Sequence, residues 1–499
     1  MLLLFCVLAL PVIFFFVLPK YRKNNELLRP PGPSGLPFLG NLHQIDNLAP
    51  HKYLWQLSKK YGPLMSLRLG FVPTLVVSSA RMAKEVLKTH DLAFSSRPAL
   101  VGQQKLSYNG LDMVFAPYTD YWKEIRKICI INLFSSKRVQ SFRPIRDDEV
   151  GRMIKKISQQ ATSSKLTNLS DIVMSLTSAT ICRVAFGKRY DDEGAERSRF
   201  HRLLNETQAM FGILFVSDHF PIFGWIDKLT GLSSRLEQNF TEMDAFYQQL
   251  IDDHLDQKKT KGTQEDFIDI LLQLKEDQLC SIDLNFDHIK AVLMNMLVAG
   301  SDTGAATLVW AMIGLMKNPR VMKKVQEEIR KLVVKKGKVD EDDLQNLPYL
   351  KAVVKETMRL YSTVPLLVPR ETTQKCIING YEIQPKTLVY VNAWAIGRDP
   401  EAWKNPDEFL PERFLDSDID FKGQHFELIP FGAGRRICPA IHMGSILVEH
   451  ALANLLYSFD WELPAGMKKE DIDTDVIPGI TMHKKNALCL QAKHYDGQT

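Results

Sequence analysis

Apolar residues recur at helical spacing over most of this chain. Five such stretches, each with apolar residues three and four apart, cover residues 82–90, 118–132, 145–159, 167–186 and 236–257. A different pattern occupies residues 64–77, where apolar and polar positions alternate and Val, Thr and Leu are enriched, so we expect a small β-hairpin there. The pattern therefore predicts a mainly α fold with minor β.

A longer apolar stretch, residues 286–317, predicts a helix of about 45 Å that ends at Asn318-Pro319. A helix that is apolar on nearly every face must cross the core, yet polar residues interrupt this one at its middle. Gly300 could leave room for a flat ligand, and the Asp302 carboxylate and Thr303 hydroxyl could relay protons. The alternative is a kink, in which the threonine hydroxyl bonds a carbonyl one turn back.

The N-terminus has the character of a membrane anchor. Residues 2–18 are apolar apart from Pro11, and a basic cluster at residues 20–23 follows them directly. Because no basic residues precede the apolar run and no cleavage site follows it, we predict a retained anchor over residues 1–19 rather than a signal peptide. The basic cluster keeps the following chain in the cytosol. A stiff basic and proline-rich hinge is expected over residues 20–37, and one large domain over residues 38–499.

Composition narrows the function classes. The 499 residues are 45% hydrophobic and 24% charged, which fits a globular chain with a large core. A net charge of +5 with scattered Lys and Arg residues does not indicate nucleic-acid binding. The seven cysteines are odd in number and lack framework spacing, so we expect a reducing compartment and no disulfides.

The most informative chemistry lies in residues 431–438, which read Phe-Gly-Ala-Gly-Arg-Arg-Ile-Cys. Pro439 and an apolar run to residue 456 place Cys438 at a predicted helix N-terminus, where the helix dipole stabilises a thiolate. Gly434 allows a tight loop, Phe431 can shield the sulfur, and Arg436 can reach an anionic group of a cofactor. A plain buried thiol is one alternative, and a zinc site shared with His442 is another, although further ligands at suitable spacing are missing.

Two further groups are ambiguous by themselves. Glu356 and Arg359 are three residues apart on a predicted helix over residues 349–361, which is ordinarily a solvated ion pair, but Arg413 in Pro-Glu-Arg-Phe could complete a network. Trp122, with Arg126 one helical turn on, could contact a cofactor or belong to the core, and Arg370 could be solvated.

Together these motifs resemble the cytochrome P450 superfamily. The spacing FxxGxRxC resembles the haem-binding loop of that family, and the segments PPGPSGLP, AGSDT, PERF and FGAGRRICPA are similar to those of plant microsomal A-type members, in the large family 71 group devoted to secondary metabolism. The resemblance implies the cytochrome P450 fold, with a single large haem domain behind an N-terminal membrane anchor. The chain departs from the family pattern at Gly304, where Ser or Thr is usual, and at Ala440, where Gly is common.

The resemblance also implies residue roles. Cys438 would be the axial ligand of the iron of haem b, and Thr303 and Asp302 would support proton delivery during oxygen activation. Phe431, Gly434 and Gly300 would surround the haem. The propionate-binding roles would fall to Trp122, Arg126, Arg370 and Arg436, and the structural triad to Glu356, Arg359 and Arg413.

The implied activity is insertion of one oxygen atom from dioxygen into a small apolar or aromatic substrate at the endoplasmic reticulum membrane. Electrons would come from NADPH through a membrane-bound flavin reductase, steered by cations such as Lys127, Lys422 and Arg435. Substrate contacts are expected in apolar, irregular segments at residues 100–118, 210–225, 364–368 and 478–482, and residues 211–225 would dip into membrane lipid. The rival readings are a reductase-independent rearrangement or dehydration enzyme and a non-catalytic haem-binding membrane protein; retention of both Asp302 and Thr303 favours the oxygenase.

Overall fold

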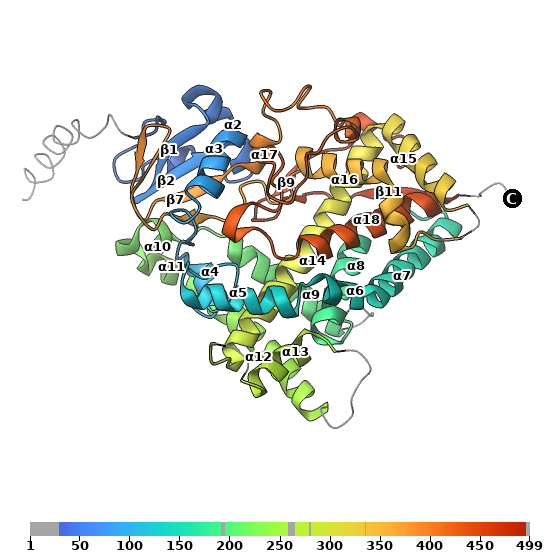
Figure 1. Cartoon of the computed structure of the whole chain (residues 1–499), viewed down its shortest axis with the longest axis horizontal. Helices are drawn as coiled ribbons and strands as arrows, with labels where there is room; N and C mark the ends of the chain where they lie inside the picture. Colours follow the sequence, from blue (N-terminus) through green and yellow to red (C-terminus); the bar gives the residue numbers. More distant parts are fainter. Residues whose placement is uncertain (1–28, 191–194, 258–264, 279–280, 335, 496–499) are drawn as a thin grey trace, which may run out of the picture.

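The structure is a computed structural model that describes residues 29–190, 195–257, 265–278, 281–334 and 336–495. Long helices surround one central helix, and small sheets lie at two ends of the molecule (Figure 1). The predicted anchor over residues 1–19 and the first half of the predicted hinge, residues 20–28, fall outside the described residues, so both stay predictions.

The longer helices follow the apolar periodicity of the sequence. Their bounds are α2 (Pro50–Tyr61), α5 (Asp120–Asn132), α7 (Arg143–Thr162), α8 (Leu169–Phe186), α9 (Ala195–Gly212), α12 (Leu232–Gln257), α13 (Phe267–Glu276), α14 (Phe286–Lys317), α15 (Pro319–Leu332), α16 (Pro348–Leu360) and α18 (Ile441–Ser458). Shorter helices are α3 (Ala80–Lys84), α4 (Val101–Leu106), α6 (Ser136–Ser141), α10 (Val216–His219), α11 (Trp225–Leu229) and α17 (Ala393–Ile396). Single tight turns are η2 (Leu42–Gln44), η4 (Pro221–Phe223), η5 (Glu341–Asn346), η6 (Pro411–Phe414), η7 (Gly434–Arg436) and η8 (Lys469–Asp471), and η3 (Glu85–Thr89) is a π-helical turn that continues α3.

The strands are short. They are β1 (Leu64–Leu69), β2 (Val72–Val77), β3 (Thr167–Asn168), β4 (Arg370–Glu371), β5 (Cys376–Ile378), β6 (Tyr381–Ile383), β7 (Leu388–Val391), β8 (Phe459–Glu462), β9 (Val476–Ile477), β10 (His483–Lys484) and β11 (Cys489–His494). The largest sheet has the order β1-β2-β7-β4, with β1 antiparallel to β2 and β2 parallel to β7. The other sheets are β3-β11-β8, β5-β6 and β9-β10.

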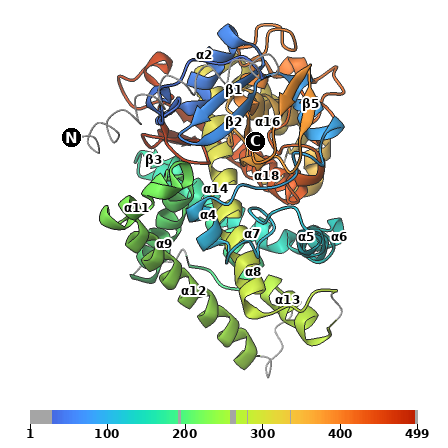
Figure 2. The ribbon, with the colours of Figure 1, turned by 90° about the vertical axis from the view of Figure 1, so that its left-hand side faces the viewer.

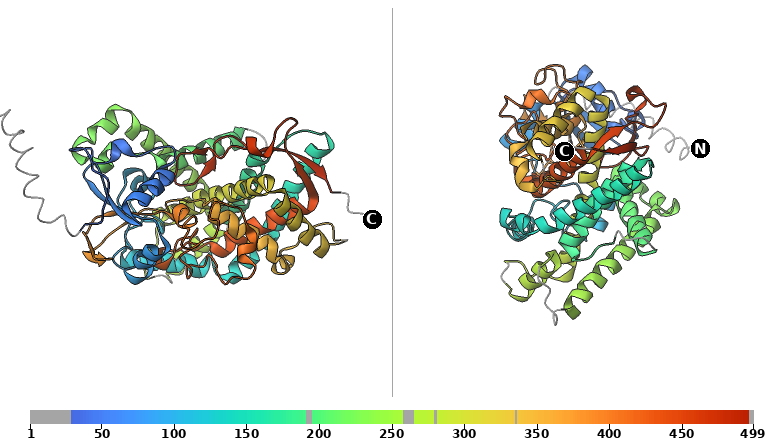
Figure 3. Two further views of the ribbon diagram at one scale, coloured as in Figure 1. Left: turned by 90° about the horizontal axis from the view of Figure 1, so that it is seen from above. Right: turned by 90° about the vertical axis from the view of Figure 1, so that its right-hand side faces the viewer.

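Helix α14 crosses the molecule, with the helical layer that contains α12 and α13 on one side and the largest sheet on the other (Figure 2). It begins at a capping box in which Asn285 and His288 exchange side-chain and backbone hydrogen bonds, and it ends where Asn318 precedes Pro319. It packs against α8 and α18. Seen from above, the β1–β2 hairpin and the β8–β11 sheet lie at opposite ends of the molecule (Figure 3).

Several predicted elements match the structure closely. The hairpin over residues 64–77 and the helix over residues 286–317 have the expected bounds, and α5, α7, α12 and α16 lie within a few residues of the predicted positions. Two predictions are wrong in detail. Residues 167–168 pair with β11 instead of starting α8, and the helix after the cysteine loop begins at Ile441 rather than Pro439. The region 210–225, expected to be irregular, contains the end of α9 together with α10 and η4.

Two helices, Leu169–Phe186 and Phe286–Lys317, are long and apolar enough to cross a membrane by composition. In their most apolar windows, however, 78% and 72% of the residues are buried inside the protein. We therefore assign both helices to the core of the domain.

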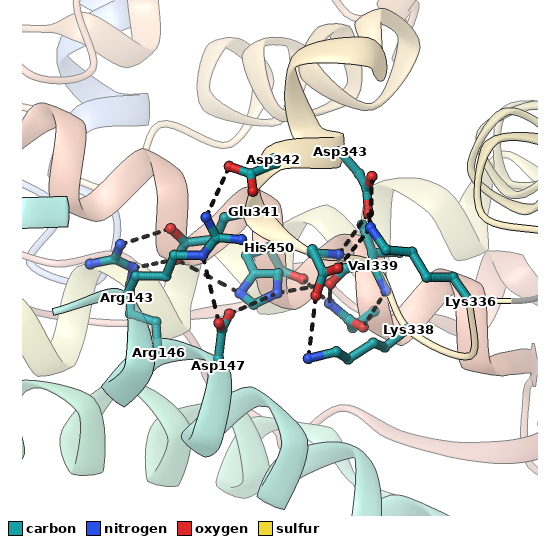
Figure 4. A network of polar contacts seen from close by, with 12 residues as sticks. Arg143, Arg146, Asp147, Lys336, Lys338, Val339, Glu341, Asp342, Asp343 and His450 are labelled. Atoms are coloured by element: carbon teal, nitrogen blue, oxygen red, sulfur yellow. Dashed lines mark hydrogen bonds and ion pairs between the residues drawn. The ribbon is translucent and has the colours of Figure 1, made fainter. Parts of the chain in front are cut away.

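A buried polar network joins the middle of α18 to α7 and η5 (Figure 4). Arg146 donates through two nitrogens to both carboxylate oxygens of Glu341, and its side chain is 1% exposed. His450 of α18 donates from Nε2 to the Val339 carbonyl at 3.0 Å, and Asp147 lies 3.7 Å from the same nitrogen. This network holds the helix that follows the cysteine loop.

Candidate active site

The cysteine loop closes on itself. The Cys438 amide donates to the Phe431 carbonyl at 3.0 Å, and the Phe431 ring packs against Phe421 at 5.3 Å between centroids. Gly434 has a φ of +69°, and a Cβ there would lie 2.1 Å from the Leu87 carbonyl oxygen, so only glycine fits the position. The loop thus presents a half-buried Cys438 from a backbone that is fixed on both sides.

The expectation that a helix dipole acts directly on this thiol needs correction. Cys438 lies three positions before the first residue of α18, and Ala440 is the N-cap. Burial raises the pKa of the Cys438 thiol, and this effect is opposed by the Ala440 amide, which donates to the sulfur, and by the charge of Arg126. Metal coordination would deprotonate this thiol.

Four arginine side chains from distant segments converge beside the loop. Arg126 donates to the Ile437 carbonyl at 2.5 Å, and Arg436 donates to the Ser95 and Ala116 carbonyls at 2.7 and 2.6 Å. Arg97 donates to the carbonyls of the 368–369 turn, and Arg370 donates to the Ala433 carbonyl at 2.9 Å. Burial and mutual repulsion lower the pKa of Arg436 to about 9 and that of Arg370 to about 10.

This cluster fits an anionic cofactor. Arg436 is 7% exposed, and its Nη1 is buried without a hydrogen-bond partner. The nearby carboxylates are Asp91, which is 3.6 Å from Arg370, and the buried Asp112, whose oxygens already accept bonds from Asn295 and the Phe115 amide. Because several buried guanidinium groups face few acids, an added pair of carboxylates would satisfy both their charge and the free donor.

The structure shows the surroundings of two predicted cofactor-binding residues and places beside them an arginine, Arg97, that sequence reasoning did not single out. The Trp122 indole N–H donates to the Met113 carbonyl at 2.9 Å, and the ring lies 3.9 Å from the Arg436 guanidinium, so Trp122 supports Arg436 as a cation–π platform. Arg370 is occupied by Asp91 and the loop backbone, so it holds the loop in place. Arg97 was missed because a single arginine outside any motif carries no sequence signal.

The centre of α14 is less buried than the rest of the helix. Ala299 is exposed and Thr303 half-buried, although the helix is otherwise buried over residues 289–297 and 305–315. The Thr303 hydroxyl donates to the Ala299 carbonyl at 2.9 Å, as the kink alternative anticipated. On another face of the helix, Asp302 is 6% exposed and in direct contact with Nε2 of His483, a partner that the sequence analysis did not identify.

The prediction that Gly300 makes room for a flat ligand is wrong. A Cβ at this position would lie 2.8 Å from Cγ1 of Ile181, so the glycine makes room for α8 rather than for a flat ligand. A hydrogen bond stabilises this close packing of α8 on α14: the Thr177 hydroxyl donates to the Ser301 carbonyl at 2.6 Å. A Cβ at Gly304 would meet Thr177 Cγ2 at 3.2 Å, so this departure from the family pattern also faces α8.

Glu356, Arg359 and Arg413 form one buried network. Arg359 donates to both oxygens of Glu356 at 2.7 and 2.8 Å, and Arg413 donates to Glu356 at 3.2 Å. The remaining arginine donors bind backbone carbonyls of the segment 397–408. The network therefore joins α16 to the long loop that precedes the cysteine, and the reading of Glu356 and Arg359 as a solvated pair is wrong.

The four predicted substrate segments lie next to one another. Phe115 stacks on Phe211 at 4.9 Å, which joins the first segment to the second. A Cβ at Gly212 would lie 3.1 Å from Cα of Gly479, so the second segment meets the fourth. The Met482 amide donates to the Thr363 carbonyl at 2.7 Å, beside the third. These segments also contact α14, because the Met113 amide donates to Asn295 at 3.1 Å.

Possible metal ligands do not gather around Cys438 in the described part of the chain. The described clusters are Asp147, Glu341 and His450, and His254, Asp266 and Asp269. Arg146 occupies both oxygens of Glu341 in the first, and Asp266 caps α13 in the second. His442 is exposed on α18, so the zinc alternative has no support. Among the described cysteines, Cys129, Cys376, Cys438 and Cys489 are not in disulfides.

Comparison with known proteins gives matches over nearly the whole chain. The sequence profile of the cytochrome P450 family matches residues 30–490. The chain is 54% identical to 6,7,8-trihydroxycoumarin synthase of Pastinaca sativa over 99% of its length and 98% of the relative, and 48% identical to cytochrome P450 71A1 of Persea americana over 98% of each chain. A zebrafish cytochrome P450 structure with progesterone superposes with a TM-score of 0.76 at 26% identity, covering 89% of this chain and 99% of the other.

The family brings a haem b cofactor and electron supply from a redox partner, and the buried arginine cluster beside the half-buried Cys438 fits such a group. With the family 71 relatives, the fold and the site in agreement, the resemblance stated from the sequence is confirmed. The chain belongs to the cytochrome P450 family and is a haem monooxygenase related to enzymes of plant secondary metabolism.

Proposed function

We propose that Cys438 holds the haem iron and that Arg97, Arg126 and Arg436 bind the haem propionates. The observation that carries this proposal is the buried, unpartnered Nη1 of Arg436 within a cluster of guanidinium groups. Trp122 supports Arg436 from one face. Arg370, Phe431 and Gly434 keep the loop in shape around the sulfur.

When bound, the haem supplies dioxygen activation, in which one oxygen atom enters the substrate and the other leaves as water. The residues of the chain serve this chemistry by handling protons and by excluding water. The half-buried Thr303 hydroxyl donates to the Ala299 carbonyl, so its oxygen orients a donor by accepting a hydrogen bond, and the neighbouring Asp302 carboxyl group supplies the proton in its protonated form. The buried helix on either side of Ala299 limits access of bulk water.

A planar aromatic lactone of the coumarin class is the substrate that we favour. The support is the 54% identity to a trihydroxycoumarin synthase, together with the stacked Phe115 and Phe211 rings between two of the substrate segments. A flat aromatic ligand gains both apolar burial and ring stacking in such surroundings. The synthase's name indicates ring hydroxylation, and we infer the same reaction here.

The test is a labelled-oxygen incubation. Membranes that carry the full chain and a plant NADPH-dependent flavin reductase receive NADPH, labelled dioxygen and a panel of coumarin and its hydroxylated derivatives. We expect one labelled atom in a product that forms only with NADPH. A Thr303→Ala variant should release more hydrogen peroxide per NADPH, and Thr303→Ser should restore coupling. Labelled products from other compound classes, with none from coumarins, would contradict the substrate assignment and leave the oxygenase intact.

We also propose that one face of the domain lies against the endoplasmic reticulum membrane. Ile222, Trp225 and Leu229 are 76%, 55% and 77% exposed, and Phe71 and Phe38 are 42% and 58% exposed. These positions are neighbours, because the Phe71 amide donates to the His219 carbonyl and its ring contacts Phe220 at 5.5 Å. Five large apolar side chains on one face favour insertion into lipid.

Lipid contact is measured by fluorescence quenching. In vesicles that contain brominated lipid, wild type should lose more tryptophan emission than Trp225→Phe, because Trp225 would lie among the acyl chains. Equal fractional quenching in the two proteins would place this face in water.

We propose that the reductase docks on the cysteine side, over a surface hollow of about 460 Å³ that Arg126, Arg435 and Lys123 line. The local field is moderate, since Arg435, Lys127 and Lys422 each have an acidic neighbour. Arg435→Glu should therefore slow reduction at low salt and have a smaller effect at high salt, as expected for screened charges. An unchanged reduction rate at low salt would exclude this docking face.

A further inference from the structure

Asp302 and His483 form an ion-pair contact between α14 and β10. Asp302 lies on α14 and is 6% exposed, whereas the His483 side chain on β10 is 26% exposed. Oδ1 of Asp302 contacts Nε2 of His483 directly. The histidine thus stands between a buried carboxylate and the solvent-accessible side of the β9–β10 hairpin.

The backbone that carries His483 is firmly held. The Trp310 indole N–H of α14 donates to the Met482 carbonyl at 2.7 Å, and the Met482 amide donates to the Thr363 carbonyl at 2.7 Å. Thr363 is itself bonded to Thr307 of α14 at 3.0 Å between hydroxyl oxygens. Because the residue beside His483 is fixed at two points, the imidazole is positioned rather than placed by chance on a mobile loop.

The charges around His483 leave Asp302 as its acidic partner. Lys484, the next residue on β10, pairs with Asp473 at 2.7 Å, so both of those charges are already balanced. Lys485 is exposed, and its amide donates to the Asp475 carbonyl. Among the described ion pairs, the contact with Asp302 is the one that involves His483.

We propose that His483 supplies protons to Asp302 and positions its carboxylate, which makes it the outer member of the path that leads to Thr303. A proton from water joins Nδ1, the proton on Nε2 passes to Oδ1 of Asp302, and the ring is left neutral as the Nδ1–H tautomer. Proton exchange with water then restores the Nε2–H tautomer for the next cycle. No electron is transferred, and one proton moves inward in each cycle. The proposal rests on the proton relay of Asp302 and Thr303 proposed above. Imidazole suits this role because it exchanges protons near neutral pH.

Two substitutions separate proton transfer from positioning. His483→Gln keeps an N–H donor for Asp302 but cannot relay a proton, and His483→Phe removes both abilities. Lys485→Ala, on the same hairpin, is the matched control. The full chain with haem and reductase is assayed with coumarin itself as the probe, and the peroxide released per NADPH and the effect of D₂O on NADPH oxidation are measured.

We expect both His483 variants to raise the peroxide fraction about threefold and to enlarge the D₂O effect, while Lys485→Ala behaves as wild type. Wild-type values for His483→Gln with a defect in His483→Phe would overturn proton transfer. If Asp302→Asn raises the peroxide fraction and both His483 variants do not, the inference fails and the proposed relay stands. If Asp302→Asn also has no effect, the relay itself fails, and the inference fails with it.

A measurement independent of turnover tests the contact. Denaturation midpoints of wild type, Asp302→Asn, His483→Gln and the double variant form a double-mutant cycle. We expect the double variant to lose less than the sum of the two single losses, because the paired residues interact directly. Strictly additive losses would show that the two side chains do not interact, and would overturn the inference.

Discussion

Arg359 holds Glu356 through two hydrogen bonds of 2.7 and 2.8 Å, and both side chains are completely buried. A buried charge that loses its partner is strongly destabilised, so Glu356→Ala should lower the unfolding free energy by about 3–5 kcal/mol. Haem content per polypeptide should fall with it, because this network also holds the loop before Cys438. The measurements are urea unfolding and haem absorbance per protein.

The control is Arg143→Ala. Arg143 pairs with Asp342 at 2.9 Å, but its side chain is 25% exposed and the acid 71% exposed. Removing this surface pair should cost less than about 1 kcal/mol. Equal losses in the two variants would mean that burial does not determine the strength of the Glu356 network.

Gly300 and Gly304 offer a contrast within one helix. A methyl group at Gly300 collides with Ile181, whereas one at Gly304 meets only Thr177 Cγ2 at 3.2 Å. Gly300→Ala should therefore destabilise by about 1–3 kcal/mol. Gly304→Ala should stay within about 0.5 kcal/mol of wild type, because the gain in helix propensity offsets the tight contact. Thermal or urea unfolding of both variants measures the difference.

A second substitution tests the cause. Ile181→Ala removes the atoms that Gly300→Ala would meet, so adding Gly300→Ala to Ile181→Ala should cost much less stability than adding it to wild type. An equal cost in the two backgrounds, with Ile181→Ala alone well folded, would show that the cost at Gly300 does not come from the contact with α8.

Glu449 on α18 makes the free energy of unfolding depend on pH. Burial raises the pKa of this carboxyl from 4.5 to about 7, and Lys351 and Lys355 partly offset the effect. The folded state thus favours the protonated acid. The contribution of this group to the free energy of unfolding is complete below pH 4.5 and is lost as the pH rises through 7. Glu449→Gln should be more stable than wild type at pH 8 by about 2 kcal/mol, with allowance for partial exposure.

Urea unfolding at pH 5 and pH 8 provides the measurement, and the difference between wild type and Glu449→Gln cancels the other titrating groups. The variant's advantage should be clearly larger at pH 8 than at pH 5. An advantage that is the same at both values would show that Glu449 titrates normally.

The sequence predicted those parts that depend on local pattern. The helix over residues 286–317 and the tight glycine at Gly434 follow from apolar spacing, a proline stop and a turn that needs positive φ. The parallel pairing of β2 with β7 and the contact of Asp302 with His483 join segments that are far apart in the chain. No local pattern in these segments identifies the partner. The contact of Gly300 with α8 was not predicted, because the sequence does not tell which element packs against a glycine within a helix.

Arg97 could not be predicted from the sequence, because it is a single arginine outside any motif and its partners lie far from it in the chain. Its guanidinium donates to the carbonyls of Val114, Val368 and Pro369, and it is 8% exposed. Burial and the neighbouring Arg436 and Arg370 charges lower its pKa, so bound carboxylates would relieve the repulsion. Arg97→Leu should therefore weaken haem retention more than Arg97→Lys, which keeps the charge but loses the fork of donors. Haem loss to apomyoglobin measures retention; equal loss rates for wild type and Arg97→Leu would remove Arg97 from the propionate site and leave it a purely structural link between these segments.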